Sequence, residues 1–89
     1  MMKLIVAIVH HSDGEEILRV LTEAGLTVTR IASSGGFLRW GNATLLIGLE
    51  AERVAEAVGL IREYSGPPVD PGLKRVTVFV LNVERSEQI

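Results

Sequence analysis

An unbroken apolar run near the N-terminus places the tightest limit on how this chain can fold. Lys3 is followed by six aliphatic residues, Leu4 to Val9, with no polar alternation. Such a run is typical of a strand that is covered on both faces. It is far too short to cross a membrane, so no membrane is expected as a partner. The chain has 89 residues, which is the length of one domain. Its other segments must therefore pack on both faces of this strand.

A helix is predicted directly after this strand. Ser12 and Glu15 have the spacing of a capping box, in which each side chain bonds the other's backbone N–H. Apolar residues then recur every three or four positions, and Gly25 stands where a left-handed C-terminal cap is needed. These signals predict a helix over Asp13–Ala24.

Four further segments complete the pattern. Two runs rich in β-branched residues, 26–33 and 43–49, predict strands that pair as a hairpin. Segment 51–64 has the apolar stripe of an amphipathic helix, and 74–83 reads as a last strand. The order is typical of a single α+β, ferredoxin-like βαββαβ domain over residues 1–89. In that fold a four-stranded antiparallel sheet carries both helices on one face.

The last predicted strand is apolar on both faces. Alternate residues of a strand point to opposite sides. One side receives Val76, Val78 and Val80, and the other receives Thr77, Phe79, Leu81 and Val83. With both helices on one face, a monomer would expose a contiguous apolar sheet, which soluble monomers rarely do. We therefore predict a cyclic homo-oligomer that buries this face.

Charge and composition exclude several classes of function. The net charge is −2 with both signs interspersed, so neither DNA nor RNA is expected as a partner. Cysteine is absent, which leaves no thiolate metal site and is compatible with the expected reducing cytoplasm. Mixed charges on the second predicted helix are typical of a solvated face, and they are Arg53, Glu56, Arg62 and Glu63.

The two histidines do not form a recognisable site. If His10 and His11 both continue the first strand, they point to opposite faces and cannot hold one ion together. No third ligand accompanies them at a recognisable spacing. We also find no activated nucleophile or acid–base pair. The sequence therefore predicts no catalytic residue, no metal, no cofactor and no enzymatic activity.

A glycine-rich turn separates the two hairpin strands. Gly36 and Gly41 have the glycine spacing of a phosphate-binding P-loop, but Asn42 and Ala43 replace its Lys and Ser/Thr. The turn also joins two strands and does not open a helix, which excludes a nucleoside triphosphatase. Two interpretations stay open. In the first, the glycines only allow the backbone conformation that a hairpin loop requires. In the second, they let backbone amides approach a small ligand.

Taken together, these segments resemble a known family. The stretches that carry the resemblance are Lys3–Val9, Thr29–Leu38 with its TRIASSGGFL sequence, Gly41-Asn42, Gly48, Val76–Val80 and Glu87-Gln88. They are collinear, cover most of the chain, and look like the PII-like cyclic-di-AMP receptor family of bacteria. The Gly-Gly-Phe-Leu and Gly-Asn series is the most specific part of the match.

The resemblance implies a non-enzymatic, cytoplasmic signal-transduction protein. It implies a homotrimer of ferredoxin-like subunits that binds cyclic-di-AMP or another nucleotide between subunits and acts on an unknown protein target. The ligand-binding candidates carried over are Thr29, Gly36, Phe37, Leu38, Asn42, Gly48, Phe79 and Gln88. Phe37, Leu38 and Phe79 are suited to packing on a purine ring. The side-chain amides of Asn42 and Gln88 are suited to hydrogen bonds with the edge of the purine.

The chain departs from the family pattern at two places. Thr27 stands where the family usually has an arginine, and only Ser65–Gly72 replaces a long loop before the last strand. Two alternatives therefore stay open. One is a trimeric structural or interaction protein that has lost nucleotide binding, and the other is a regulatory module for another small ligand.

Overall fold

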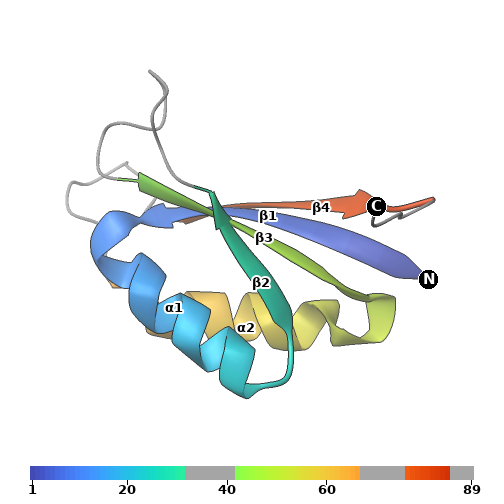
Figure 1. Ribbon diagram of the computed structural model, residues 1–89, viewed down its shortest axis with the longest axis horizontal. Coiled ribbons are helices and arrows are strands. Elements are labelled where there is room, and N and C mark those ends of the chain that lie inside the picture. Colours follow the sequence, from blue (N-terminus) through green and yellow to red (C-terminus); the bar gives the residue numbers. More distant parts are fainter. Residues whose placement is uncertain (32–41, 67–75, 85–89) are drawn as a thin grey trace.

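The predicted order of elements is confirmed in the computed structural model, which describes residues 1–31, 42–66 and 76–84. The elements are β1 (Met2–His10), α1 (His11–Glu23), β2 (Thr27–Ile31), β3 (Asn42–Glu50), the 3-10 turn η1 (Ala51–Arg53), α2 (Val54–Tyr64) and β4 (Val76–Asn82). The strands form one sheet in the order β2-β3-β1-β4, and all neighbours are antiparallel. Both helices lie on the same face of this sheet (Figure 1). The second predicted helix is thus split into η1 and α2.

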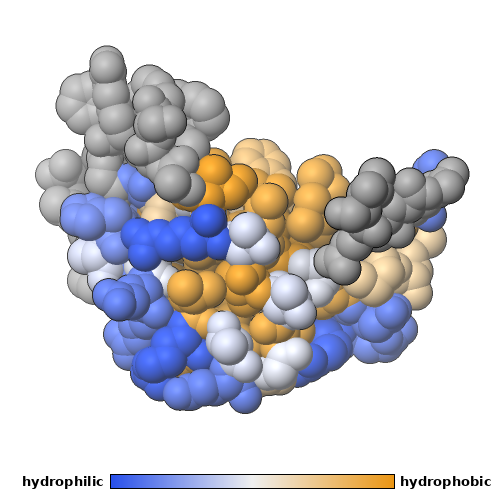
Figure 2. All heavy atoms as spheres, viewed as in Figure 1, coloured by the Kyte–Doolittle hydropathy of each residue, from blue (hydrophilic) through white to orange (hydrophobic). Residues whose placement is uncertain are grey.

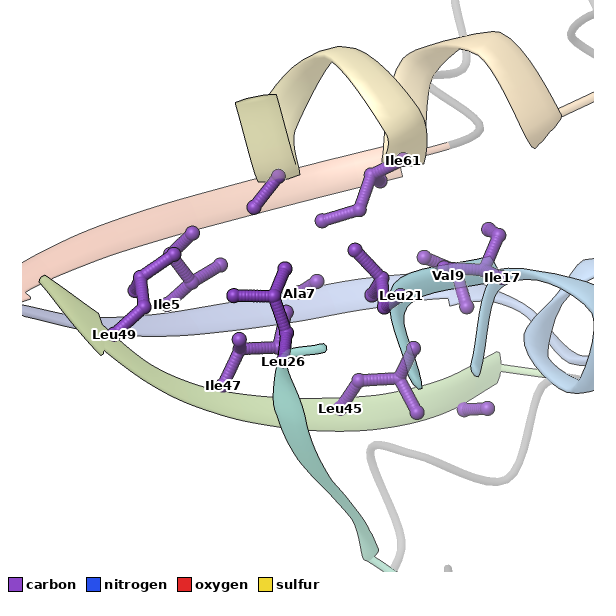
Figure 3. Close-up of a cluster of buried hydrophobic side chains, with 12 residues drawn as sticks. Ile5, Ala7, Val9, Ile17, Leu21, Leu26, Leu45, Ile47, Leu49 and Ile61 are labelled. Atoms are coloured by element: carbon purple, nitrogen blue, oxygen red, sulfur yellow. The ribbon is translucent and has the colours of Figure 1, made fainter. Parts of the chain in front are cut away.

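The core lies between the sheet and the two helices (Figure 3). Ile5, Ala7 and Val9 of the central strand β1 are completely buried on this side. Their neighbours in the core come from both helices and from β3, and include Ile17, Leu21, Ile61, Leu45 and Ile47. Burying one such side chain contributes about 1.5–3 kcal/mol to folding. The apolar run that begins the chain therefore forms the centre of the domain.

The start of α1 differs from its predicted position. The backbone N–H of Ser12 donates to Nδ1 of His10 at 3.3 Å, so His10 is the N-cap residue. The capping box predicted for Ser12 and Glu15 is wrong in this respect. His11 already belongs to α1 and does not continue the strand. The two imidazole rings lie with their centroids 4.9 Å apart, because the chain turns into the helix between them.

The end of α1 follows the prediction. Gly25 has a φ of +87°, the left-handed conformation that glycine adopts without strain. The N–H of Leu26 donates to the carbonyl of Leu21 at 3.1 Å, and that of Gly25 donates to Thr22 at 3.0 Å. This pair of bonds is a Schellman motif. It turns the chain sharply and directs Thr27 into β2.

The sheet face away from the helices, called the open face below, is largely apolar. Strand register places the following side chains on it: Leu4, Val6 and Ile8 of β1, Leu46 of β3, Ile31 of β2, and Phe79 and Leu81 of β4. Phe79 is 52 % exposed and Leu81 49 % exposed. Figure 2 shows hydrophobic residues reaching the surface on this side of the sheet. The prediction of a second apolar face is therefore confirmed.

Candidate functional site

Four of the eight predicted ligand-binding residues are described, and all four lie on the open face. Thr29 pairs with Leu46 across β2 and β3, while Phe79 pairs with Val6 across β4 and β1. Asn42 and Gly48 share the same side of β3, because they are separated by an even number of residues. The other four candidates, with the glycine turn, lie outside the described residues: Gly36, Phe37, Leu38 and Gln88.

These four described candidates are spread over the sheet. Thr29 and Phe79 stand on the two outer strands, with β3 and β1 between them, so about 14 Å separates their backbones. Asn42 and Gly48 are at opposite ends of β3, about 20 Å apart at the rise of an antiparallel strand. One chain therefore does not gather these four residues around a single small ligand.

A pocket of about 280 Å³ lies at the end of the sheet where β2 begins. It includes Gly48, a predicted site residue, together with its cross-strand partner Thr27. The remaining lining residues are Met2, Gly25, Leu26, Leu49, Glu50 and Arg53. A Cβ built on Gly48 would meet no atom within 4 Å. The backbone of Gly48 is therefore accessible to a ligand in this pocket.

Arg53 is the cation of this pocket, and sequence reasoning missed it. It was assigned to a solvated helix face, but its side chain is only 36 % exposed. Nη2 donates to the carbonyl of Ala24 at 2.8 Å, where α1 ends. That contact joins residues 29 positions apart in the chain. The pattern of charges within one helix cannot show a contact between two residues so far apart in the chain. No signal in the sequence therefore indicated it.

A carboxylate holds the Arg53 guanidinium in place. Nε and Nη2 donate to the two oxygens of Glu56 at 3.0 and 3.1 Å. The hydrogen bond from Arg53 lowers the pKa of Glu56, and their coulombic attraction acts in the same direction. The same hydrogen bond raises the pKa of Arg53. The pair is therefore charged at neutral pH, and the guanidinium plane is fixed at the pocket.

Another cavity, of about 360 Å³, lies between α2 and β4. Its walls are mostly apolar and include Val58, Ile61, Val76 and Val78. It contains none of the described site candidates. In residues 1–31, 42–66 and 76–84 no three His, Asp or Glu side chains are placed to hold a metal ion. No helix within these ranges is long and apolar enough to cross a membrane.

Thr44 presents an unusual polar group on the open face. Its side chain points to this side of β3, between Ile31 and Ile8 of the neighbouring strands. The residue is only 6 % exposed, and its hydroxyl has no hydrogen-bond partner in the part of the chain that the structure describes. A buried hydroxyl without a partner costs about 1–3 kcal/mol. Thr44 was not among the predicted site residues.

Replacing Thr44 by valine should therefore stabilise the protein by about 1 kcal/mol, since the shape is kept and the unsatisfied hydroxyl is removed. Urea denaturation at one fixed protein concentration measures the change. Thr77→Val is the matched control, because Thr77 flanks Ile8 from the other side but is exposed to water. A loss of stability in Thr44→Val would contradict the prediction and indicate that the hydroxyl has a hydrogen-bond partner.

Comparison with known proteins identifies the family. Residues 2–67 match the family model described as cyclic-di-AMP receptor. The chain belongs to the cyclic-di-AMP receptor family. Its structure is also similar to the crystal structure of a functionally unknown protein from Pediococcus pentosaceus ATCC 25745, with a TM-score of 0.79 and 32 % sequence identity. That alignment covers 99 % of this chain and 97 % of the other chain.

The cyclic-di-AMP receptor match covers most of the candidate site. Thr29, Asn42 and Gly48 fall within it, as does the glycine turn of residues 35–38. Phe79 and Gln88 lie beyond its end at residue 67. The family supports a receptor role, which is a binding and signalling role. It also confirms the resemblance that the sequence segments suggested.

Proposed function

We propose that this protein is a non-enzymatic, PII-like signal-transduction protein that binds cyclic-di-AMP between the subunits of a homotrimer. The observation that carries the proposal is the placement of the described candidates. Thr29, Asn42, Gly48 and Phe79 share the open face, yet they are too far apart in one chain to surround one ligand. Packing the open faces of three subunits around one axis would place residues of different subunits beside each other.

The chemistry of the candidates suits a purine nucleotide. Phe79 offers an exposed aromatic surface on which a base can stack. The amide of Asn42 has the donors and acceptors that a purine edge requires. Gly48 lets a ligand approach the backbone closely. We propose that the backbone of Gly36 contacts a phosphate and that Phe37 and Leu38 pack on the base. We propose that the side-chain amide of Gln88 forms a hydrogen bond with the edge of the base.

Isothermal titration with cyclic-di-AMP, ATP and cyclic-di-GMP tests this proposal. We expect saturable binding of cyclic-di-AMP, one ligand per subunit interface, and weaker binding of the other two nucleotides. Light scattering of the same sample should give the mass of a trimer. The absence of heat with all three nucleotides at millimolar concentration would overturn the binding function, and a monomeric mass would remove the interface.

Phe37→Ala should weaken cyclic-di-AMP binding by about 1–3 kcal/mol, because it removes a stacking surface for the base. Trp40→Ala is the control, since it removes the other aromatic of the same turn, which is not a ligand candidate. We expect its affinity to stay within a factor of two of the wild type. Equal losses in both variants would mean that the aromatics only support the turn, and the placement of Phe37 would then be wrong.

A trimeric interaction protein without a nucleotide is the second candidate function. The presence of Thr27 favours it, because the family resemblance leads one to expect a cation at that position. The protein would then bind its target equally well with and without cyclic-di-AMP. Comparing the proteins captured from a lysate in the two conditions separates this candidate from the leading proposal.

A further inference from the structure

The pocket beside Thr27 and Gly48 contains an arginine with unused donors. Arg53 makes three hydrogen bonds, and they involve only Nε and Nη2. Nη1 has no bond to any described residue. It lies near the backbone of Gly25, since a Cβ built on that glycine would be 4.0 Å from Nη1. Gly25 and Arg53 both line the pocket.

This arrangement is preorganised for an anion. A guanidinium presents its N–H groups in a rigid fork, and two of its nitrogens are already fixed by Glu56 and Ala24. An oxyanion at Nη1 would gain charged hydrogen bonds without the need to order a flexible side chain. The exposed hydroxyl of Thr27 and the unobstructed backbone of Gly48 border the same space.

The acidic residues around the pocket set a limit on this attraction. Glu50 lines it, but its carboxylate accepts a hydrogen bond of 3.2 Å from the amino group of Met1. Glu56 is engaged by Arg53 itself. Both carboxylates are therefore paired with a cation, which reduces their repulsion of a bound anion.

We propose that Nη1 of Arg53 donates to a phosphate of the nucleotide bound beside Thr27 and Gly48. This inference rests on the proposed function and adds a binding residue to it. The cation comes from the end of η1, on a different element from the strand that carries Thr27. A phosphate at this point lies against the first residue of β2 and the backbone of β3. Thr27 and Gly48 share the open face with Thr29 and Phe79, the other described candidates on this sheet surface.

Two variants separate a phosphate contact from a structural role. Arg53→Gln removes the cation and its pair with Glu56, whereas Glu56→Gln removes the pair but keeps the cation. Titrated with cyclic-di-AMP, Arg53→Gln should raise the Kd about tenfold or more, because a charged hydrogen bond to phosphate is lost. Glu56→Gln should change the Kd much less, because the amide oxygen of glutamine can still accept a hydrogen bond from Arg53. Thermal unfolding of both variants shows whether the fold is kept.

The outcomes distinguish this inference from the function on which it rests. Wild-type protein that binds no nucleotide overturns the function itself. Wild-type binding with an unchanged Kd in Arg53→Gln overturns only the role of Arg53. Equal weakening in Arg53→Gln and Glu56→Gln also overturns it, since both variants would then act through the lost pair.

A third variant decides the matter if Arg53→Gln does not fold. Glu50→Gln leaves the bonds of Arg53 intact and removes a negative charge from the pocket wall. It should lower the Kd for cyclic-di-AMP about twofold, because a like charge near the phosphate is gone. The control is Glu52→Gln, which makes the same change at an exposed residue that does not line the pocket. Binding by Glu50→Gln that is no tighter than binding by Glu52→Gln would count against the phosphate contact of Arg53.

Discussion

Replacing Val6 by aspartate should convert the assembled protein into folded monomers. Val6 lies in the middle of the open face, with Leu46 and Phe79 as its cross-strand neighbours. A carboxylate buried in an apolar interface without a partner costs several kcal/mol, whereas in a monomer it meets water. The helix side of β1 is untouched, because Val6 points away from the core. Light scattering should therefore report the mass of one chain, with an unchanged circular dichroism spectrum.

Ala55→Asp is the control for this experiment. It introduces the same charge at an exposed residue of α2, on the opposite side of the domain from the open face. Its mass should equal that of the wild type. If Val6→Asp keeps the wild-type oligomeric mass, the open face does not form the interface, and the proposed binding sites between subunits fail with it.

Replacing Leu45 by alanine should lower the free energy of unfolding by about 2–5 kcal/mol, the usual cost of a large-to-small substitution in a packed core. Leu45 is completely buried, and on the helix side of the sheet it lies next to Ala7 of β1. Small domains are stable by only about 5–15 kcal/mol in total. The variant is therefore expected to unfold at a much lower urea concentration than the wild type.

Leu18→Ala provides the comparison, because Leu18 is a partly buried leucine of α1 outside the core cluster. Its removal should cost far less, and both variants are measured by urea denaturation at the same protein concentration. If Leu45→Ala lowers the free energy of unfolding no more than Leu18→Ala does, Leu45 does not belong to the packed core.

The two predictions probe opposite faces of the same strands. Truncating a core side chain on the helix side is expected to change the stability of each subunit, whereas a charge placed on the open face is expected to change the association of subunits. The ligand-binding candidates Thr29, Gly48 and Phe79 belong to the second group. Assembly and nucleotide binding are therefore expected to be coupled, with cyclic-di-AMP stabilising the trimer through mass action.

The sequence was sufficient for the order of elements because their signals are local. The apolar run Leu4–Val9, the alternation along Val76–Val83 and the position of Gly25 each depend on neighbours within one element. The error at the start of α1 has a local cause as well. His10 accepts the capping bond that was assigned to Ser12, and imidazole is rarely considered as a cap because serine and aspartate are more frequent there.

Residue periodicity by itself determined which side chains of each strand share a face, and so predicted an apolar sheet surface without a cover. Only the tertiary structure decided how these faces align between strands, since register depends on pairing between distant segments. Gly48 of β3 pairs with Thr27 of the neighbouring strand β2, and Arg53 donates a hydrogen bond to the carbonyl of Ala24, 29 residues away in the chain. These contacts create the pocket and its cation. They arise from packing between elements, which no pattern within a single element records.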